Sequence, residues 1–101
     1  MYKIFRTTSF KKDYKKLNSI DKKLVKDMIL KLSNGEKLEE RYKDHNLVGN
    51  YLGCKECHIK PDLLLIYRVD NDILELALVR AGSHSKLFWN SKYFIDNKNQ
   101  E

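Results

Sequence analysis

The sequence predicts a single α+β domain, in which two N-terminal helices pack on a small twisted antiparallel sheet. Two observations lead to this prediction. Apolar residues recur at helical spacing in the first third of the chain, whereas the second half contains short runs rich in leucine, β-branched and aromatic residues. The 101 residues are enough for one modest core. Helices that precede a block of strands are typical of an α+β fold.

The first third predicts a strand followed by a helical hairpin. Residues 2–6 are aromatic and β-branched, which favours a strand. Thr8 or Ser9 is expected to cap a first helix and Ser19 a second one. The two apolar stripes are Phe10, Tyr14 and Leu17, and Ile20, Leu24, Val25, Met28, Ile29 and Leu32. Gly35 suits the left-handed position that ends a helix.

The second half predicts a three-stranded meander. After a polar loop over residues 36–50, we expect strands over residues 51–59, 63–69 and 73–80, with a hairpin turn at 70–72. The middle run is apolar over residues 63–67, as in a strand buried on both faces. The N-terminal strand would join one edge, and the helical hairpin would cover one face. On the last strand, one face should carry Leu74, Leu76, Leu78 and Arg80.

The charge is concentrated in the first half of the chain. The formal net charge is +6 and the pI about 9.3. Residues 1–43 hold thirteen Lys or Arg against six Asp or Glu, whereas residues 44–101 hold seven against eight. A basic field of this kind favours a polyanionic partner such as nucleic acid or an acidic protein. The alternative is an ordinary solvated helical face.

Several classes of protein are disfavoured by composition. Two cysteines do not make a disulfide framework. The N-terminus lacks the apolar run of a signal peptide, and no segment approaches the length of a membrane span. We therefore expect a soluble cytoplasmic protein with reduced thiols and no membrane partner.

The segment 54–58 reads Cys-Lys-Glu-Cys-His, the attachment motif of a c-type haem. Half of a zinc site is the other metal interpretation. Both are disfavoured, because the motif falls on a predicted strand, where Cys54 and Cys57 would point to opposite faces. We therefore expect no cofactor and no metal.

The same alternation places Glu56 and His58 together on one face. A carboxylate beside an imidazole suits acid–base chemistry. Arg80 and His84 could approach this face, and His45 could reach it from the loop. Such a set resembles a metal-free phosphodiesterase site: an imidazole takes the ribose 2′-OH proton, a second imidazole or Asp62 protonates the leaving oxygen, and arginine stabilises the phosphorane.

Two less specific interpretations remain open. Each histidine taken alone is more often an ordinary surface or hydrogen-bonded residue. The lysine clusters would also suit a non-catalytic module that binds RNA or a protein partner.

Three blocks resemble the YafQ-type toxins of the RelE/ParE superfamily. They are Tyr-Lys-Asp-His-Asn-Leu-Val-Gly at 42–49, Glu-Cys-His-Ile-Lys-Pro-Asp-Leu-Leu-Leu-Ile-Tyr-Arg at 56–68, and Arg-Ala-Gly-Ser-His-Ser-Lys-Leu-Phe at 80–88. Their order and spacing agree with the family over about residues 2–88. The resemblance implies a RelE-like fold and a type II toxin–antitoxin system.

The resemblance also implies an activity and partners. Toxins of this kind are endoribonucleases that cut mRNA, generally in the A site of the 30S ribosomal subunit. Attack by the 2′-OH leaves a cyclic phosphate and needs no metal. A cognate antitoxin, expected here to be of the ribbon–helix–helix type, inhibits the toxin and forms a hetero-oligomer with it.

Site residues carry over by position. The resemblance implies catalytic roles for His45, His58, Asp62 and His84, a neighbouring carboxylate at Glu56 and a phosphate-binding arginine at Arg80. The RNA-binding residues that we expect are Lys43, Lys55, Lys86 and Phe88, the last as a base-stacking ring.

Two departures from the family pattern stand out. Many members have an aromatic residue and Arg where this chain has Cys54 and Lys55, and a lysine binds phosphate without the bidentate geometry of arginine. The chain also continues beyond the usual end of the family. We therefore expect a toxin domain at residues 1–88 and a C-terminal extension at 89–101.

Overall fold

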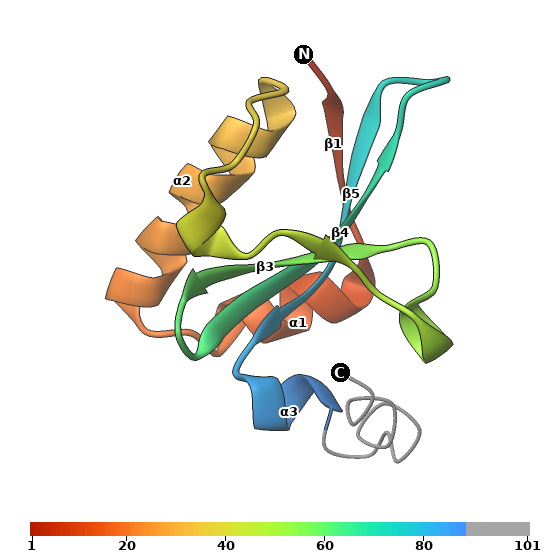
Figure 1. The fold of residues 1–101 in the computed structure, drawn as a ribbon. Coiled ribbons are helices and arrows are strands. Elements are labelled where there is room, and N and C mark those ends of the chain that lie inside the picture. The colour runs from red at the N-terminus through yellow and green to blue at the C-terminus, as the bar shows by residue number, and fades with distance from the viewer. Residues whose placement is uncertain (89–101) are drawn as a thin grey trace.

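A computed structural model describes residues 1–88 of the chain. The helices are α1 (Thr8–Lys15), α2 (Ser19–Ser33) and the short α3 (His84–Phe88); the strands are β1 (Lys3–Arg6), β2 (His45–Asn46), β3 (Lys55–Lys60), β4 (Leu63–Asp70) and β5 (Glu75–Gly82). Two 3₁₀ turns, Glu40–Tyr42 and Gly49–Tyr51, flank β2. The α+β prediction is confirmed, and Figure 1 shows α3 after the end of β5.

The strands form one five-stranded sheet in the order β1-β5-β4-β3-β2. Consecutive strands from β2 to β5 pair antiparallel, which confirms the meander. β1 joins the edge as expected, but it runs parallel to β5 (Figure 1). The long connection permits parallel pairing, because the helical hairpin and β2–β4 separate the two strands in the chain.

The two faces of the sheet bury different apolar clusters. One face packs against α1 and α2 around Phe10, Val25, Met28, Cys57 and Leu65. The opposite face carries a smaller cluster of five residues, Leu47, Leu64, Ile66, Leu87 and Phe88, two of which come from α3. Among the described residues, the helix over the second face is the short α3, which leaves room for polar side chains.

Both predicted helix caps are wrong by one residue. Thr7, not Thr8 or Ser9, accepts the hydrogen bond from the Phe10 amide at 3.1 Å. Asn18, not Ser19, accepts from the Asp21 amide at 2.7 Å. In each case the cap residue has extended backbone, as an N-cap requires, and the chain becomes helical at the next residue.

Two strands begin later than predicted. β3 begins at Lys55 because residues 49–51 form a 3₁₀ turn and Gly53 has a φ of +95°. β5 begins at Glu75, and Leu74 lies in the hairpin turn with a φ of +51° and an exposed side chain. Leu74 therefore does not share a buried face with Leu76 and Leu78, contrary to the alternation expected from the sequence.

Among residues 1–88, no helix has the length and apolar character needed to span a membrane. The predicted extension, residues 89–101, lies outside the described residues. The proposed boundary after residue 88 therefore stays a prediction.

Candidate active site

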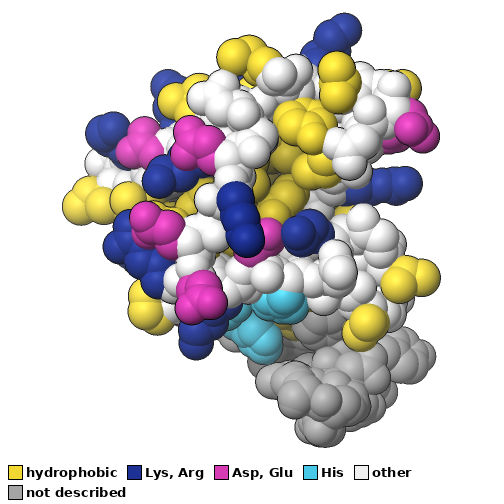
Figure 2. Space-filling view, turned by 45° about the horizontal axis from the view of Figure 1, so that its top comes forward, with side chains coloured by type: hydrophobic (Ala, Val, Ile, Leu, Met, Phe, Trp, Pro, Cys, Tyr) yellow, Lys and Arg dark blue, Asp and Glu magenta, His cyan; other side chains and the backbone are white. Residues whose placement is uncertain are grey.

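The site is centred on the Glu56 carboxylate, which is 5% exposed. His45 lies opposite Glu56 in the β2–β3 register, and His58 follows two residues later on the same face of β3. Both imidazole Nε2 atoms lie 3.4 Å from the same carboxylate oxygen, Oε1. Figure 2 shows the histidine side chains gathered at one place on the surface, bordered by charged side chains. The structure thus brings together three of the predicted residues.

A backbone carbonyl fixes the tautomer of His45. Its Nδ1 lies 2.6 Å from the carbonyl oxygen of Lys43, which can only accept a hydrogen bond. Nδ1 must therefore carry the proton, and in neutral His45 the Nε2 atom presents a lone pair to Glu56. A lone pair facing a carboxylate is unfavourable unless a proton lies between them. His45 Nε2 is therefore placed to accept a hydrogen bond from Glu56 once that carboxylate has taken up a proton.

Burial perturbs the pKa values of the two groups on β3. It raises the pKa of Glu56, and the charge of His45 opposes this only in part. The pKa of His58 is lowered, first by burial and then by the charges of His45, Lys43 and His84. Near neutral pH His58 is therefore neutral, and Glu56 is a stronger base than an exposed glutamate.

Asp44 anchors the loop that delivers His45. The Tyr67 hydroxyl of β4 donates a hydrogen bond to its carboxylate, and Lys55 forms an ion pair with it at 3.1 Å. Burial and Asp44 raise the pKa of Tyr67, so the phenol stays protonated and keeps donating. The preceding residue, Lys43, adopts a left-handed conformation with a φ of +46°. These contacts place the Lys43 carbonyl and His45 where the cluster needs them.

His84 begins α3 and is exposed. Its ring packs against Phe88 with centroids 4.9 Å apart, and its backbone N–H donates to Asp62 Oδ1 at 3.2 Å. Asp62 therefore holds the start of α3 against the β3–β4 turn. Phe88 is 1% exposed and also packs edge-on against Tyr51, so its ring is not an open stacking surface in this structure.

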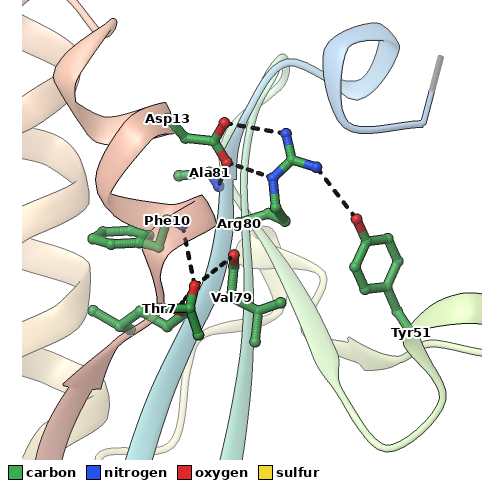
Figure 3. Close-up of polar contacts among 8 residues, drawn as sticks. Thr7, Phe10, Asp13, Tyr51, Val79, Arg80 and Ala81 are labelled. Atoms are coloured by element: carbon green, nitrogen blue, oxygen red, sulfur yellow. Dashed lines mark hydrogen bonds and ion pairs between the residues drawn. The ribbon is translucent and has the colours of Figure 1, made fainter. Parts of the chain in front are cut away.

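Arg80 is engaged by a partner that the sequence did not suggest. Its guanidinium forms two hydrogen bonds with Asp13 of α1, at 2.6 and 3.1 Å (Figure 3). The interaction with Asp13, more than any other contribution, raises the pKa of Arg80. Asp13 carried one detectable sequence signal: it is the only acidic residue in α1 and lies beside the apolar stripe.

The remaining predicted RNA-binding residues are spread out. Lys43 and Lys86 are exposed, the first beside His45 and the second on α3. Lys55 lies opposite Tyr67, on the helix-covered face, and is engaged by Asp44. The structure therefore does not bring Lys55 to the histidine face.

The two thiols separate as strand alternation predicted. Cys57 is fully buried in the cluster under α1 and α2, whereas Cys54 packs against the opposite cluster. Burial and the nearby carboxylates raise the pKa of Cys57 to about 12, so it is an unreactive thiol. Among the described residues, the group that could ligate a metal is His45, Glu56 and His58, whose donor atoms lie within 4.8 Å of one another.

Comparisons with known proteins identify relatives of this chain. The chain is 38% identical over 61 residues to the mRNA interferase toxin YafQ of Escherichia coli K12, an alignment covering 60% of this chain and 64% of that protein. A metal-bound toxin from Helicobacter pylori is 43% identical, with a TM-score of 0.79 over 87% of this chain and 100% of that one.

The E. coli DinJ–YafQ toxin–antitoxin complex contains a chain 31% identical to this one, with a TM-score of 0.74 over 86% and 97% of the two chains. The sequence model described as bacterial toxin of type II toxin-antitoxin system, YafQ, matches residues 2–89. The chain therefore belongs to the YafQ family of bacterial toxins.

Proposed function

We propose that this protein is the toxin of a type II toxin–antitoxin system and an endoribonuclease that cleaves mRNA, with the ribosome as the place of cleavage. The observation that carries the proposal is the convergence of two imidazole Nε2 atoms on one buried carboxylate oxygen, each at 3.4 Å. Such a cluster can accept and redistribute a proton without a metal.

In the proposed mechanism, Glu56 takes the proton of the ribose 2′-OH. Its raised pKa suits this role, because a stronger base shares the proton more evenly with an alcohol. The 2′-oxygen then attacks the adjacent phosphorus, forming a 2′,3′-cyclic phosphate as the 5′-oxygen leaves. The Nε2 lone pair of His45 can then share the proton that Glu56 has taken, and neutral His58 can donate a hydrogen bond to a phosphate oxygen.

The leaving 5′-oxygen needs an acid from a different direction. His84 is exposed, lies on a separate element and is oriented by Phe88 and Asp62. His84 is therefore our candidate for the general acid. Asp62 would help to position it by accepting the hydrogen bond of its backbone N–H. His58 is a poorer candidate, since its lowered pKa leaves it unprotonated near neutral pH.

The basic helical surface supports RNA as the substrate. A groove of about 410 Å³ between α1, α2 and β1 has an apolar floor and five cationic side chains. These cations are Arg6, Lys11, Lys15, Lys22 and Lys26. Such a surface attracts phosphate groups without reading sequence. It would also serve a non-catalytic RNA-binding module, which the experiment below distinguishes.

The test is to map RNA cleavage on translating ribosomes and on free mRNA for wild type and His84→Ala. We expect new 5′ ends with wild type, loss of those ends with His84→Ala, and relief of growth arrest in cells that express the variant. Ser85→Ala, an exposed neighbour on α3, is the matched control. If wild type cut RNA neither on ribosomes nor as free mRNA, the enzymatic proposal would be wrong and the non-catalytic binding module would be favoured.

We also infer a cognate antitoxin of the ribbon–helix–helix type, a cytoplasmic location and no membrane partner. The support is the family itself and the relative that forms a complex with DinJ. If a short reading frame lies next to the gene, its coexpression with the toxin should restore growth and yield a stable complex on size exclusion. A toxin that remains monomeric and lethal in that coexpression would contradict the inference.

A further inference from the structure

Arg80 reaches the histidine face because β5 contains a bulge. Arg80 pairs with Ile66, while the next pair along the ladder is Tyr67 with Leu78, so Val79 has no partner of its own. One extra unpaired residue shifts the side-chain alternation of a strand, so that the residues beyond it point to the opposite face from the one that a regular strand would give. Arg80 therefore shares a face with Ile66 and, one strand further, with Glu56, instead of continuing the buried face of Leu78 as the simple alternation predicted.

Asp13 holds the guanidinium from the side. It is 5% exposed, and its Oδ2 accepts from Arg80 Nε at 2.6 Å and from the Ala81 backbone N–H at 3.0 Å. Its Oδ1 accepts from Arg80 Nη2 at 3.1 Å. β1 pairs with β5 only as far as Leu78, so α1 is the element beside Arg80 and Ala81 (Figure 3).

The opposite side of the guanidinium faces the second half of the site. Arg80 Nη1 donates to the Tyr51 hydroxyl at 3.4 Å, and Figure 3 shows Asp13 and Tyr51 approaching the guanidinium from opposite sides. The Tyr51 ring packs against Phe88, which in turn packs against His84. Three of the five guanidinium N–H groups thus have acceptors among the described residues, and the others remain for a ligand.

We propose that Asp13 is a positioning residue for RNA cleavage, which holds the Arg80 guanidinium so that its remaining N–H groups bind the scissile phosphate between the Glu56 cluster and His84. The inference rests on the proposed function. If residue 13 served only to join α1 to β5, it would need one oxygen to accept the hydrogen bond of the Ala81 backbone N–H. An asparagine at this position would also provide that oxygen. Asp13 instead orients a planar, fork-shaped donor, and arginine recognises phosphate through that fixed plane.

The structure offers a control for the purely structural role. Thr7 also joins α1 to β5, since its hydroxyl lies within hydrogen-bonding distance of the Leu78 and Val79 carbonyls and caps the helix (Figure 3). It makes no contact with Arg80 in the described hydrogen bonds. Thr7→Val should therefore lower the melting temperature while the cleavage rate, measured well below that temperature, stays near wild type.

The test is a double-mutant cycle with Asp13→Asn, Arg80→Lys and the double variant, using the full chain. The readouts are single-turnover cleavage, affinity for a 2′-O-methyl RNA that cannot be cut, and thermal unfolding. We expect Asp13→Asn to slow cleavage by about tenfold or more and to change affinity much less. In the Arg80→Lys background, Asp13→Asn should have little further effect, because a lysine ammonium has no plane to orient. Asp13→Glu, which keeps the charge, should recover part of the rate.

Three results would overturn the role of Asp13. They are wild-type cleavage by folded Asp13→Asn, the same fractional loss in the Arg80→Lys background, and an equal loss in Thr7→Val. Each leaves the proposed function intact, provided that wild type cuts RNA and His84→Ala does not. Absence of cleavage by wild type would instead overturn the proposed function, and this inference with it.

Discussion

Glu56 and Cys57 are adjacent in β3 and almost equally buried, yet their surroundings differ completely. Cys57 points into the cluster beneath α1 and α2, where burial and nearby carboxylates raise its pKa to about 12. Glu56 points to the other face, where two partly exposed imidazoles approach it. Burial alone makes a group inert; burial next to exchangeable proton partners makes it a candidate for catalysis.

The difference arises from how the two faces are covered. Two helices and a large apolar cluster seal the Cys57 face. The other face has a five-residue helix and a smaller cluster, and its edge strand β2 has two residues. On this face the short strand β2 carries His45 and the start of α3 carries His84, while strand β3 holds Glu56 and His58.

The sharpest test of this contrast substitutes Glu56 and Cys57 one at a time. Glu56→Gln should reduce cleavage by roughly 10²–10⁴-fold, because the base is removed while the shape is kept. Cys57→Ala should leave cleavage within a few-fold of wild type but reduce the free energy of unfolding by about 1 kcal/mol. Gel-based cleavage rates and urea unfolding measure both. Equal loss of cleavage in a folded Cys57→Ala protein would mean that the two faces do not differ as described.

A second prediction uses a metal to occupy the open face. Zn²⁺ prefers imidazole and carboxylate ligands, and His45, Glu56 and His58 offer three donor atoms within 4.8 Å. We expect Zn²⁺ to inhibit cleavage by about tenfold or more once the site fills, EDTA to restore it, and His45→Asn to weaken Zn²⁺ binding in a calorimeter by roughly 10–100-fold.

Mg²⁺ is the control for this prediction, because it prefers oxygen ligands and should not inhibit. Loss of wild-type cleavage on adding EDTA alone would contradict the metal-free mechanism. Unchanged Zn²⁺ affinity in His45→Asn would show that the ion binds elsewhere.

A third prediction concerns stability and pH. Burial raises the pKa of Glu56 in the folded chain, so its ionised form is more favourable in the unfolded chain. Above the ordinary pKa of glutamate this lowers the stability of wild type. Glu56→Gln should therefore melt a few degrees higher at neutral pH, and the difference should disappear as the pH falls below about 4. A variant that melts lower at neutral pH would indicate that the ionised carboxylate stabilises the fold.

The smallest effect that we predict concerns Lys43. Its charge contributes to the lowered pKa of His58, after burial and His45. Lys43→Met should raise that pKa and so move the acidic limb of the rate–pH profile upward by about a few tenths of a unit. Lys43→Arg keeps the charge and should leave the limb in place. If the two variants gave the same profile, His58 would not control the acidic limb.

The sequence was informative wherever local periodicity decides the outcome. Alternation along β3 separated Cys54 from Cys57 and placed Glu56 with His58, as the structure has them. The apolar run at residues 63–67 correctly predicted a strand buried on both faces, since Leu64 and Leu65 belong to opposite clusters. The prediction that His45 reaches this face from the loop is also confirmed, since its imidazole lies beside Glu56.

The parts that the sequence could not predict depend on long-range contacts. The bulge at Val79 changes the face of Arg80, and nothing local distinguishes it from a regular strand. Arg80 donates a hydrogen bond to Asp13 although the two are 67 positions apart in the sequence, and Tyr67 donates one to Asp44 at a separation of 23 positions. The caps were misplaced by one residue because threonine, serine and asparagine all suit that position, and only the backbone selects among them.

In the proposed mechanism, the sheet face that carries His45, Glu56 and His58 accepts the proton of the attacking ribose 2′-OH. The most direct measurement is cleavage of an mRNA carrying one 2′-deoxyribose immediately 5′ to the mapped scissile phosphate, with analysis of the product ends. We expect a 2′,3′-cyclic phosphate and a 5′-hydroxyl from normal mRNA, and no cut at the deoxy position. Cleavage at the deoxy position, or a 5′-phosphate on the product, would show that the ribose 2′-OH is not the attacking group.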